Sequence, residues 1–287
     1  MERVRWLKLY RLASELGKAF PGGVRYSSAV IVGVFLWAAI HDRPVSWACE
    51  EQHWPTRPEI RRLPSQSLMS RRLRSKAVKG LLEAMEKALR DRGEPHWVKS
   101  IDSKPLVVGP YSKDREARWG RATKHGFARG YKLHAVWDGR ALPDVWRIEP
   151  MNVADTQAAR ELLPRVSGSG YLLGDGQYDS NQLYDLAATR QHQLVAPRRK
   201  TAKGLGHQRH SPYRLRSIEL QQQSFGKALS RERSQIERSF GGLTCFGGGL
   251  APLPSWVRRP HRVELWVQAK LLINATRVLH RRSLAVA

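Results

Sequence analysis

The hydrophobic pattern of the first 95 residues predicts helices. Its longest apolar run extends from Ala29 to Ile40 and has 12 residues, short of the roughly 20 that span a bilayer, so it predicts a buried helix. Ser27 and Ser28 precede this run and can cap it. A short second helix is predicted over VSWACEEQH, and a basic third helix from Ser65 towards Gly93.

From His96 the pattern changes to an alternation of apolar and polar residues, which predicts strands. Three strands are expected close together, over HWVKSID, GYKLHAVWD and PDVWRIEP. After them DTQAARELLPRV predicts a helix, GYLLGD a buried strand, SNQLYDLAATRQ a helix and HQLVAP a strand. With the next helix the order is βββαβαβα, the layout of a ribonuclease H-like α/β domain with a mixed sheet flanked by helices.

The remainder of the chain is predicted to be a basic loop and two helices. The loop covers residues 198–216, a long polar helix covers about 219–240, and an amphipathic helix begins at His261. Gly93 and Pro95 interrupt the pattern between the two regions. We therefore expect an all-α region over residues 1–95 and an α/β domain with C-terminal helices over residues 96–287.

The charge of the chain points to an anionic partner. It has 50 Lys and Arg against 25 Asp and Glu, a formal net charge of +25. A phosphate backbone is the leading partner because its neutralisation releases condensed counterions. A ribosome-associated or merely soluble basic protein is the alternative on charge alone. The two cysteines are too few for a zinc site or a disulfide framework, so a cytoplasmic location is expected.

The order helix, short helix, basic helix in residues 1–95 is that of a helix-turn-helix, whose last helix enters the major groove. In that arrangement the bases would be faced by Gln66, Ser67, Ser70 and Arg71, with Arg72 as a further DNA contact. The alternative is a solvated basic face on an ordinary helical bundle. Arg198, Arg199 and Lys200 in the basic loop are predicted as additional DNA contacts.

Three acids stand out in this basic chain: Asp102, Asp175 and Glu237. Asp102 is predicted at the end of the first strand and Asp175 at the end of the fourth, while Glu237 lies on the long polar helix. If that helix packs across the sheet, the three carboxylates converge. Such a set suits Mg²⁺ or Mn²⁺, and two ions about 3.5–4 Å apart can clamp the oxygens of a displacement at phosphorus. Asp179 and Glu232 are the rival acids.

Five segments of the chain resemble the DDE transposases of bacterial insertion sequences, over roughly residues 97–280. They are SIDSKPL, GYKLHAVWD, MNVADTQAARELL, LLGDGQYDS and RERSQIERSFGGL, in the family's order. The resemblance implies that Asp102, Asp175 and Glu237 are metal ligands and that Arg233 contacts phosphate. Arg233 and Glu237 fit the family's Tyr-(2)-Arg-(3)-Glu-(6)-Lys signature, from which the chain departs at Ser230 and Thr244.

The resemblance implies a transposase that binds the terminal inverted repeats of its element, hydrolyses the phosphodiester bond at each end and joins the freed 3′-OH to target DNA. Two Mg²⁺ or Mn²⁺ ions, double-stranded DNA and a homodimer on DNA are expected, and no membrane. The alternatives are a DNA-binding repressor derived from a transposase and a stand-alone nuclease of the same fold.

Several other residues near these motifs are interpreted as structural. Asn152 and Asp155 would order a turn and cap the helix that follows. Lys132 and His134 could approach the site from their strand, but they are interpreted as ordinary strand residues and left out of the catalytic set. Among the tryptophans, two lie beside arginines and could stack on exposed bases: Trp119 and Trp256.

Overall fold

The computed structural model describes residues 2–23, 25–55, 59–123, 126–199, 204–205, 209–250 and 252–286. The chain forms two compact units. Unit 1 comprises Met1–Gly93, Gly242–Val257 and Arg262–Ala287, and unit 2 comprises Glu94–Gly241 and Arg258–His261. Each unit is built from segments that are discontinuous in the sequence.

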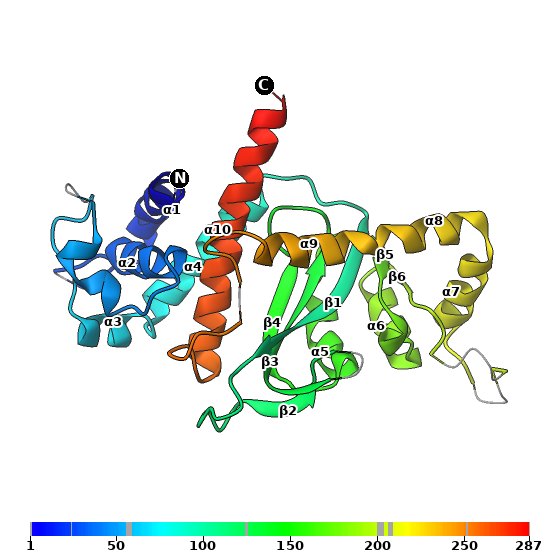
Figure 1. Ribbon diagram of the computed structural model, residues 1–287. Helices are drawn as coiled ribbons and strands as arrows, with labels where there is room; N and C mark the ends of the chain where they lie inside the picture. Colours follow the sequence, from blue (N-terminus) through cyan, green and yellow to red (C-terminus); the bar gives the residue numbers. More distant parts are fainter. Residues whose placement is uncertain are drawn as a thin grey trace. The chain divides into compact units, whose positions relative to one another are not determined.

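Unit 1 is helical, as predicted for the N-terminal region. It contains α1 (Glu2–Leu16), α2 (Ser28–Ile40), α3 (Gln66–Arg72), α4 (Lys76–Arg90) and most of α10 (Pro260–Val286), with 3₁₀ turns at Gly17–Ala19, Trp47–Cys49 and Glu51–His53 (Figure 1). The apolar run forms α2, and Ser27 caps it by accepting a hydrogen bond from the Val30 amide. The predicted second helix is instead the last two of these turns.

The predicted basic helix is two helices, α3 and α4. The Ser75 side chain accepts a hydrogen bond from the Val78 amide and so starts α4 at Lys76, four residues after α3 ends at Arg72. A serine that satisfies the first amides of a helix favours a new start over continuation of the preceding one. The sequence pattern of apolar residues continues through both helices and did not reveal this break.

The middle of the C-terminal helix α10 is buried on all sides, so this stretch is not amphipathic. Every residue from Leu265 to Arg277 is buried, including Lys270. The Lys270 ammonium donates hydrogen bonds to the Ala39 carbonyl (2.6 Å), the Asp42 carboxylate (2.5 Å) and the Gly248 carbonyl (2.9 Å). These partners all belong to unit 1. The compact units thus divide the chain differently from the predicted boundary, which placed this helix with residues 96–287.

Unit 2 is built on one mixed sheet. Its strands are β1 (Val98–Val107), β2 (Arg118–Arg121), β3 (Phe127–Trp137), β4 (Val145–Pro150), β5 (Gly170–Leu173) and β6 (His192–Val195). The strand order is β2-β3-β1-β5-β6, and β4 also pairs with β3. β3 is antiparallel to β1, β2 and β4, whereas β1, β5 and β6 run parallel to one another. This mixed sheet flanked by helices confirms the predicted fold class.

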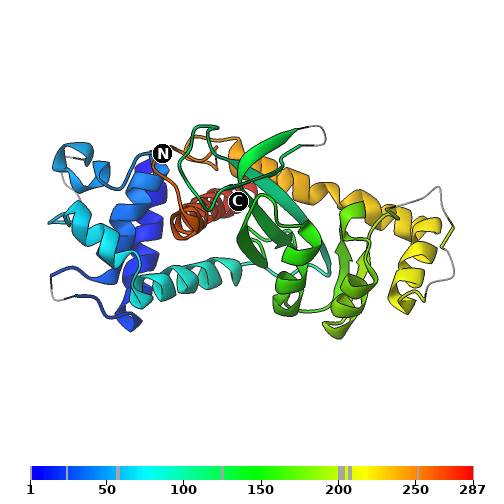
Figure 2. The ribbon, with the colours of Figure 1, turned by 90° about the horizontal axis from the view of Figure 1, so that it is seen from below.

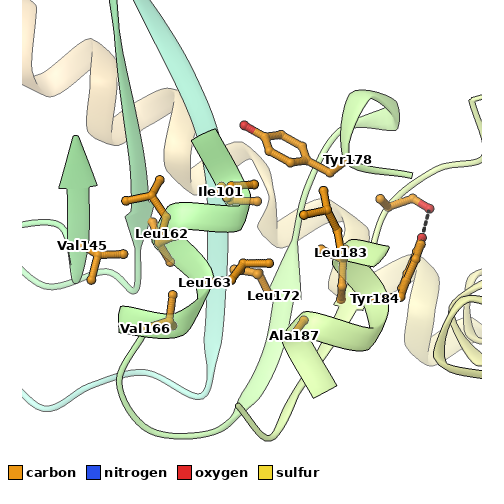
Figure 3. Close-up of a cluster of buried hydrophobic side chains, with 14 residues drawn as sticks. Ile101, Val145, Leu162, Leu163, Val166, Leu172, Tyr178, Leu183, Tyr184 and Ala187 are labelled. Atoms are coloured by element: carbon orange, nitrogen blue, oxygen red, sulfur yellow. Dashed lines mark hydrogen bonds between the residues drawn. The ribbon is translucent and has the colours of Figure 1, made fainter. Parts of the chain in front are cut away.

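Helices cover both faces of this sheet. α5 (Asp155–Leu162) and α6 (Asn181–Thr189) lie on one face, and α8 (Ser224–Glu232) and α9 (Ser234–Thr244) lie on the other (Figure 2). The larger core cluster joins the first face to α5 and α6 through residues such as Ile101, Leu162, Leu172 and Leu183 (Figure 3). A smaller cluster on the second face includes Leu173 and Leu229 of α8.

Two features of unit 2 differ from the predicted elements. β1 does not end at Asp102 but continues to Val107, paired with β3. The predicted long polar helix is three helices, α7 (Pro212–Gln222), α8 and α9. At the first break Gly226 fits closely against α7, since a Cβ there would lie 1.8 Å from the Leu220 carbonyl oxygen. Only glycine allows this approach of the two backbones.

Candidate active site

The parallel pairing of β1 with β5 places Asp102 and Asp175 beside each other. This pairing ends where Ser100 faces Leu173, two residues before each aspartate. β1 therefore continues past the end of β5, and Asp102 lies on the part of β1 that has no parallel neighbour. Both aspartates line one hollow of about 770 Å³ in unit 2. The carboxyl ends of parallel strands are where open α/β sheets bind ligands.

Three further parts of unit 2 line the same hollow. They are the β2–β3 hairpin, the segment that enters α5, and the loops that follow β5 and β6. Besides the two aspartates, the lining residues are Ser103, Pro105, Trp119, Gly120, Arg121, Ala122, Thr123, Phe127, Lys132, Met151, Asn152, Val153, Ala154, Asp155, Thr156, Gln177 and Arg199. The hollow thus combines acidic, basic and aromatic side chains.

The environment of Asp102 disfavours its negative charge. Burial raises the pKa of the Asp102 carboxyl to about 6, and the negative charges of Asp175 and Asp155 act in the same direction. The Ser103 amide, which donates to Asp102 Oδ1 at 2.8 Å, and the charge of Arg233 oppose the rise. Asp175 Oδ1 accepts a hydrogen bond from the Gln177 amide at 2.8 Å, which fixes its direction.

Asp102 and Asp175 fit a divalent cation. Their carboxylate oxygens are the hard ligands that Mg²⁺ and Mn²⁺ prefer. A cation in the hollow would also offset the burial and mutual repulsion that raise the pKa of Asp102. Within the described parts of the chain, no group of three His, Cys, Asp or Glu side chains is close enough to hold a metal. The hollow therefore supplies two of the three predicted ligands.

Glu237, the third predicted ligand, lies on α9 and does not line the hollow. Its side chain is 63% exposed and pairs with Arg233, with 3.6 Å between Arg233 Nη2 and Glu237 Oε1. Arg233 ends α8 and also acts electrostatically on Asp102. α9 packs on the sheet through Phe240, whose ring meets Trp137 of β3 edge-on at 6.0 Å. Glu237 is thus linked to the aspartates through Arg233.

A family model described as a transposase DDE domain matches residues 93–264, more than half of the chain. The chain belongs to this transposase family. A comparison with curated proteins found no match. Among solved structures, the chain is similar to a piggyBac transposase in a synaptic complex with hairpin DNA, determined by cryo-electron microscopy. The identity is 12% and the TM-score 0.42, over 96% of this chain and 73% of that chain.

The rival acids of the transposase have other partners. The Asp179 carboxylate receives two hydrogen bonds from the Arg214 guanidinium, at 2.6 and 2.8 Å, and one from the Arg199 amide at 3.0 Å. These contacts lower the pKa of Asp179 despite its burial. Asp179 therefore forms a fold-stabilising ion pair with Arg214, and the N-cap of α6 is its neighbour Ser180. Glu232 is exposed on α8 and accepts a hydrogen bond from Gln235.

The sequence interpretation treated as structural a pair of charged residues that line the hollow, Lys132 and Asp155. The Lys132 ammonium lies 3.3 Å from Asp155 Oδ1 and donates to the Val153 carbonyl. His134 Nδ1 lies 3.5 Å from the same oxygen, and burial lowers the pKa of His134 to about 4. Asp155 does not cap α5, because Ala154 is the N-cap residue. The alternation in GYKLHA, which places Lys132 and His134 on one side of β3, was the available signal.

The predicted DNA contacts of unit 2 lie partly at the hollow. Arg199 is exposed and lines it. Arg198 is half-buried and does not. Lys200 lies outside the described residues, as does His207 of the same basic loop. Among the described residues of the predicted basic loop, Arg199 lines the hollow that also contains Asp102 and Asp175.

The predicted DNA contacts of unit 1 lie around a second hollow of about 690 Å³, which both Arg71 and Arg72 line. Arg71 is exposed, whereas the Arg72 guanidinium donates to the Tyr26 carbonyl (3.3 Å) and to Ser28 Oγ (3.4 Å). Arg72 therefore ties α3 to the start of α2 within unit 1.

Among the described residues, no helix is long and apolar enough to cross a membrane.

Proposed function

We propose that this chain is a DNA transposase that binds the terminal inverted repeats of its element and cuts the phosphodiester bond at each end in a metal-dependent reaction. It then transfers the freed 3′ ends to target DNA. The observation that carries the proposal is the pair of carboxylates just past the end of the parallel pairing of β1 with β5, Asp102 and Asp175, which line one hollow. Membership of the transposase DDE family supports the same reaction class.

In this proposal Asp102, Asp175 and Glu237 hold Mg²⁺ or Mn²⁺, with two ions as the working number. Such ions, when bound, lower the pKa of water and neutralise charge that develops on phosphate oxygens. The burial of Asp102 and the neighbouring charge of Asp175 favour cation binding. For Glu237, the support is the shared partner Arg233, which pairs with Glu237 and acts electrostatically on Asp102.

The arginines near the hollow orient the substrate. Arg199 lines it and presents a guanidinium that can bind a backbone phosphate in bidentate fashion. Arg233 is proposed to contact phosphate from the α8–α9 junction. Unit 1 is proposed to bind the inverted repeats, with Arg71 as an exposed contact on α3. A homodimer on DNA is proposed because transposition holds two ends of one element together.

A strand-transfer assay with three distinct products tests the proposal. The purified chain is incubated with Mn²⁺, supercoiled plasmid and a labelled duplex that ends in a 3′-OH. Label joined to plasmid is the expected result. Nicked plasmid without joined label would indicate a stand-alone nuclease, and plasmid binding without either product would indicate a non-catalytic DNA-binding protein.

Matched variants connect the products to the proposed ligands. Asp102→Asn, Asp175→Asn and Glu237→Gln are each expected to remove cutting and joining while DNA binding is retained. Glu232→Gln is the control, because it neutralises an exposed acid on the neighbouring helix that does not line the hollow. Retained cutting in any of the first three variants would remove that residue from the proposed set.

A further inference from the structure

The β2–β3 hairpin presents two aromatic and two basic side chains on one face. In its register Trp119 lies opposite Arg129, and Arg121 lies opposite Phe127. Residues directly opposite in an antiparallel pair share a face, as do residues two apart on one strand. All four side chains therefore lie on the same face, with the two aromatics on a diagonal. Diagonal neighbours are about 7–8 Å apart.

The two aromatic rings are exposed beside the candidate ligands. Trp119 is 60% exposed and Phe127 is 70% exposed, and both line the hollow that holds Asp102 and Asp175. A single exposed aromatic residue is ordinary. Tyr111, which is 97% exposed in the same unit, is an example because it does not line the hollow. Two such rings at one wall of a charged hollow indicate a ligand with flat apolar faces.

The hairpin is held in place by its backbone. A Cβ at Gly120 would lie 2.3 Å from the Met151 carbonyl oxygen, so β2 packs directly against the segment that enters α5. The Arg129 guanidinium donates to the carbonyls of Ser112, Asp114 and Ala117 and fixes the loop before β2. Because the rings stand on an anchored strand pair, less order has to be imposed when a ligand binds.

The charge around the rings selects the ligand. Arg121 and Arg199 line the hollow with them, and Arg121 forms no ion pair within the described residues. Aromatic side chains next to arginines are typical of surfaces that bind single-stranded nucleic acid, where bases stack on the rings and cations track the backbone. A base inside a duplex has both of its faces covered by neighbours and cannot stack in this way.

We infer that Trp119 and Phe127 stack on unpaired bases of a DNA strand whose phosphates are bound by Arg121 and Arg199. The site then favours DNA that is locally single-stranded next to the phosphate to be cut. This inference rests on the proposed function for the position of that phosphate. Stacking itself requires no metal and no reaction, so binding alone can test it.

The test measures binding in EDTA by fluorescence anisotropy with three labelled probes. They are an oligothymidine of about 12 nucleotides, an abasic oligomer of the same length and a duplex of that length. The oligothymidine and the abasic oligomer share their phosphates and differ only in the bases. The unsubstituted chain is expected to bind the oligothymidine more tightly than the abasic oligomer.

Trp119→Ala and Phe127→Ala are each expected to weaken oligothymidine binding by about 5- to 150-fold, the range measured for stacking of one base. Binding of the abasic oligomer and of the duplex should not change. Tyr111→Ala is the matched control and should bind all three probes like the unsubstituted chain. Trp119→Phe keeps a ring and should retain most of the affinity.

Three results would overturn the inference. They are equal binding of the oligothymidine and the abasic oligomer by the unsubstituted chain, equal losses for both probes in the Trp119 and Phe127 variants, and a loss in the Tyr111 variant as large as theirs. Thermal unfolding verifies that each variant is folded. If Trp119→Ala does not fold, Phe127→Ala and Trp119→Phe carry the test.

A separate measurement tests the proposed function independently of the stacking. Asp102→Asn is assayed for the same three probes in EDTA and for plasmid cutting in Mn²⁺. Stacking predicts unchanged probe binding in this variant, and the proposed function predicts lost cutting. Cutting that persists with intact probe preference would refute the proposed ligands alone, whereas lost preference with normal cutting in the unsubstituted chain would refute stacking alone.

Discussion

A buried network of charges in unit 2 gives a strong test of the physical reasoning. Asp144 and Asp138 face Lys99 and Arg140, and all four side chains are buried in unit 2. Asp144 accepts hydrogen bonds from the Lys99 ammonium (3.1 Å) and the Arg140 guanidinium (2.9 Å). The Ser167 amide and hydroxyl donate to it at 2.8 and 2.6 Å. Lys99 lies on β1 three residues before Asp102.

Asp144→Asn removes one of two negative charges with little change in volume. Arg140 then keeps Asp138 as a partner, whereas the Lys99 ammonium loses the carboxylate that it pairs with and is left as a buried positive charge without compensation. Breaking a buried pair in this way costs about 3–5 kcal/mol. The amide also has a single acceptor oxygen, so it cannot accept from all four donors. We expect the free energy of unfolding to fall by about 3–5 kcal/mol, a large share of the roughly 5–15 kcal/mol typical of folded proteins.

Urea unfolding followed by circular dichroism measures this loss. Glu161→Gln is the control, since Glu161 is exposed and its pair with Arg147 spans 3.5 Å, so its removal should cost less than about 1 kcal/mol. Lys99→Met combined with Asp144→Asn removes one charge of each sign and should cost less than the sum of the single changes. A loss in Asp144→Asn as small as that of Glu161→Gln would refute the reasoning.

Three other predictions concern stability. Because burial raises the pKa of the Asp102 carboxyl from 3.8 to about 6, its negative charge destabilises the fold fully above pH 6 and not at all below pH 3.8. With allowance for partial exposure, Asp102→Asn should raise the free energy of unfolding at pH 7 by about 1–2 kcal/mol. Urea titrations at pH 7 and at about pH 4 should show that this gain disappears at the lower pH. Arg214 lowers the pKa of the Asp179 carboxyl, so the ion pair stabilises the folded state at any pH above the ordinary pKa of an aspartate. This stabilisation is lost as the pH falls through the lower pKa that Asp179 has in the folded state. Thermal unfolding should show that Asp179→Asn is less stable than the unsubstituted chain at pH 7, and that the difference shrinks below about pH 4. Lys270→Met removes the hydrogen-bond donor of the Ala39 and Gly248 carbonyls and of the Asp42 carboxylate. The free energy of unfolding should fall by about 2–3 kcal/mol, and an unchanged urea midpoint would contradict this role of Lys270.

Most of the sheet could be predicted from the sequence because its strands alternate or are continuously apolar. The exception is β2, whose four residues Arg118–Arg121 show no alternation of apolar and polar residues. Its pairing depends on the close approach of Gly120 to the Met151 carbonyl, a contact between distant segments. Sequence periodicity reports only on local burial and does not contain such contacts.

The breaks between helices were less predictable than the helices. α7, α8 and α9 follow each other so closely that their polar pattern reads as one helix. Gly226 was the one local signal, and its meaning depends on its distance to the Leu220 carbonyl. Ser75 was a comparable signal between α3 and α4, and serine is common enough within helices that its position alone did not identify a cap.

For the candidate site, the sequence predicted the acids but not their surroundings. Asp102 and Asp175 share the hollow because each follows the end of a short parallel pairing, which the strand order implies. The contact of Lys132 with Asp155 depends on where β3 passes the start of α5. The pairing of Arg233 with Glu237 follows from their spacing of four on a helix, but the approach of Arg233 to Asp102 depends on how that helix crosses the sheet.

The discontinuity of unit 1 constrains the order in which the chain can fold during synthesis. All strands of unit 2 leave the ribosome before α10 does, so the sheet can form while α2 still lacks Lys270 as the partner of the Ala39 carbonyl. Unit 1 can be completed only after the last helix has been translated. A chain released early, even with Asp102, Asp175 and Glu237 present, would leave the Ala39 and Gly248 carbonyls without their Lys270 donor, and its incomplete unit 1 would be exposed to proteases and chaperones. Translation to the end of α10 is thereby a condition for a stable product.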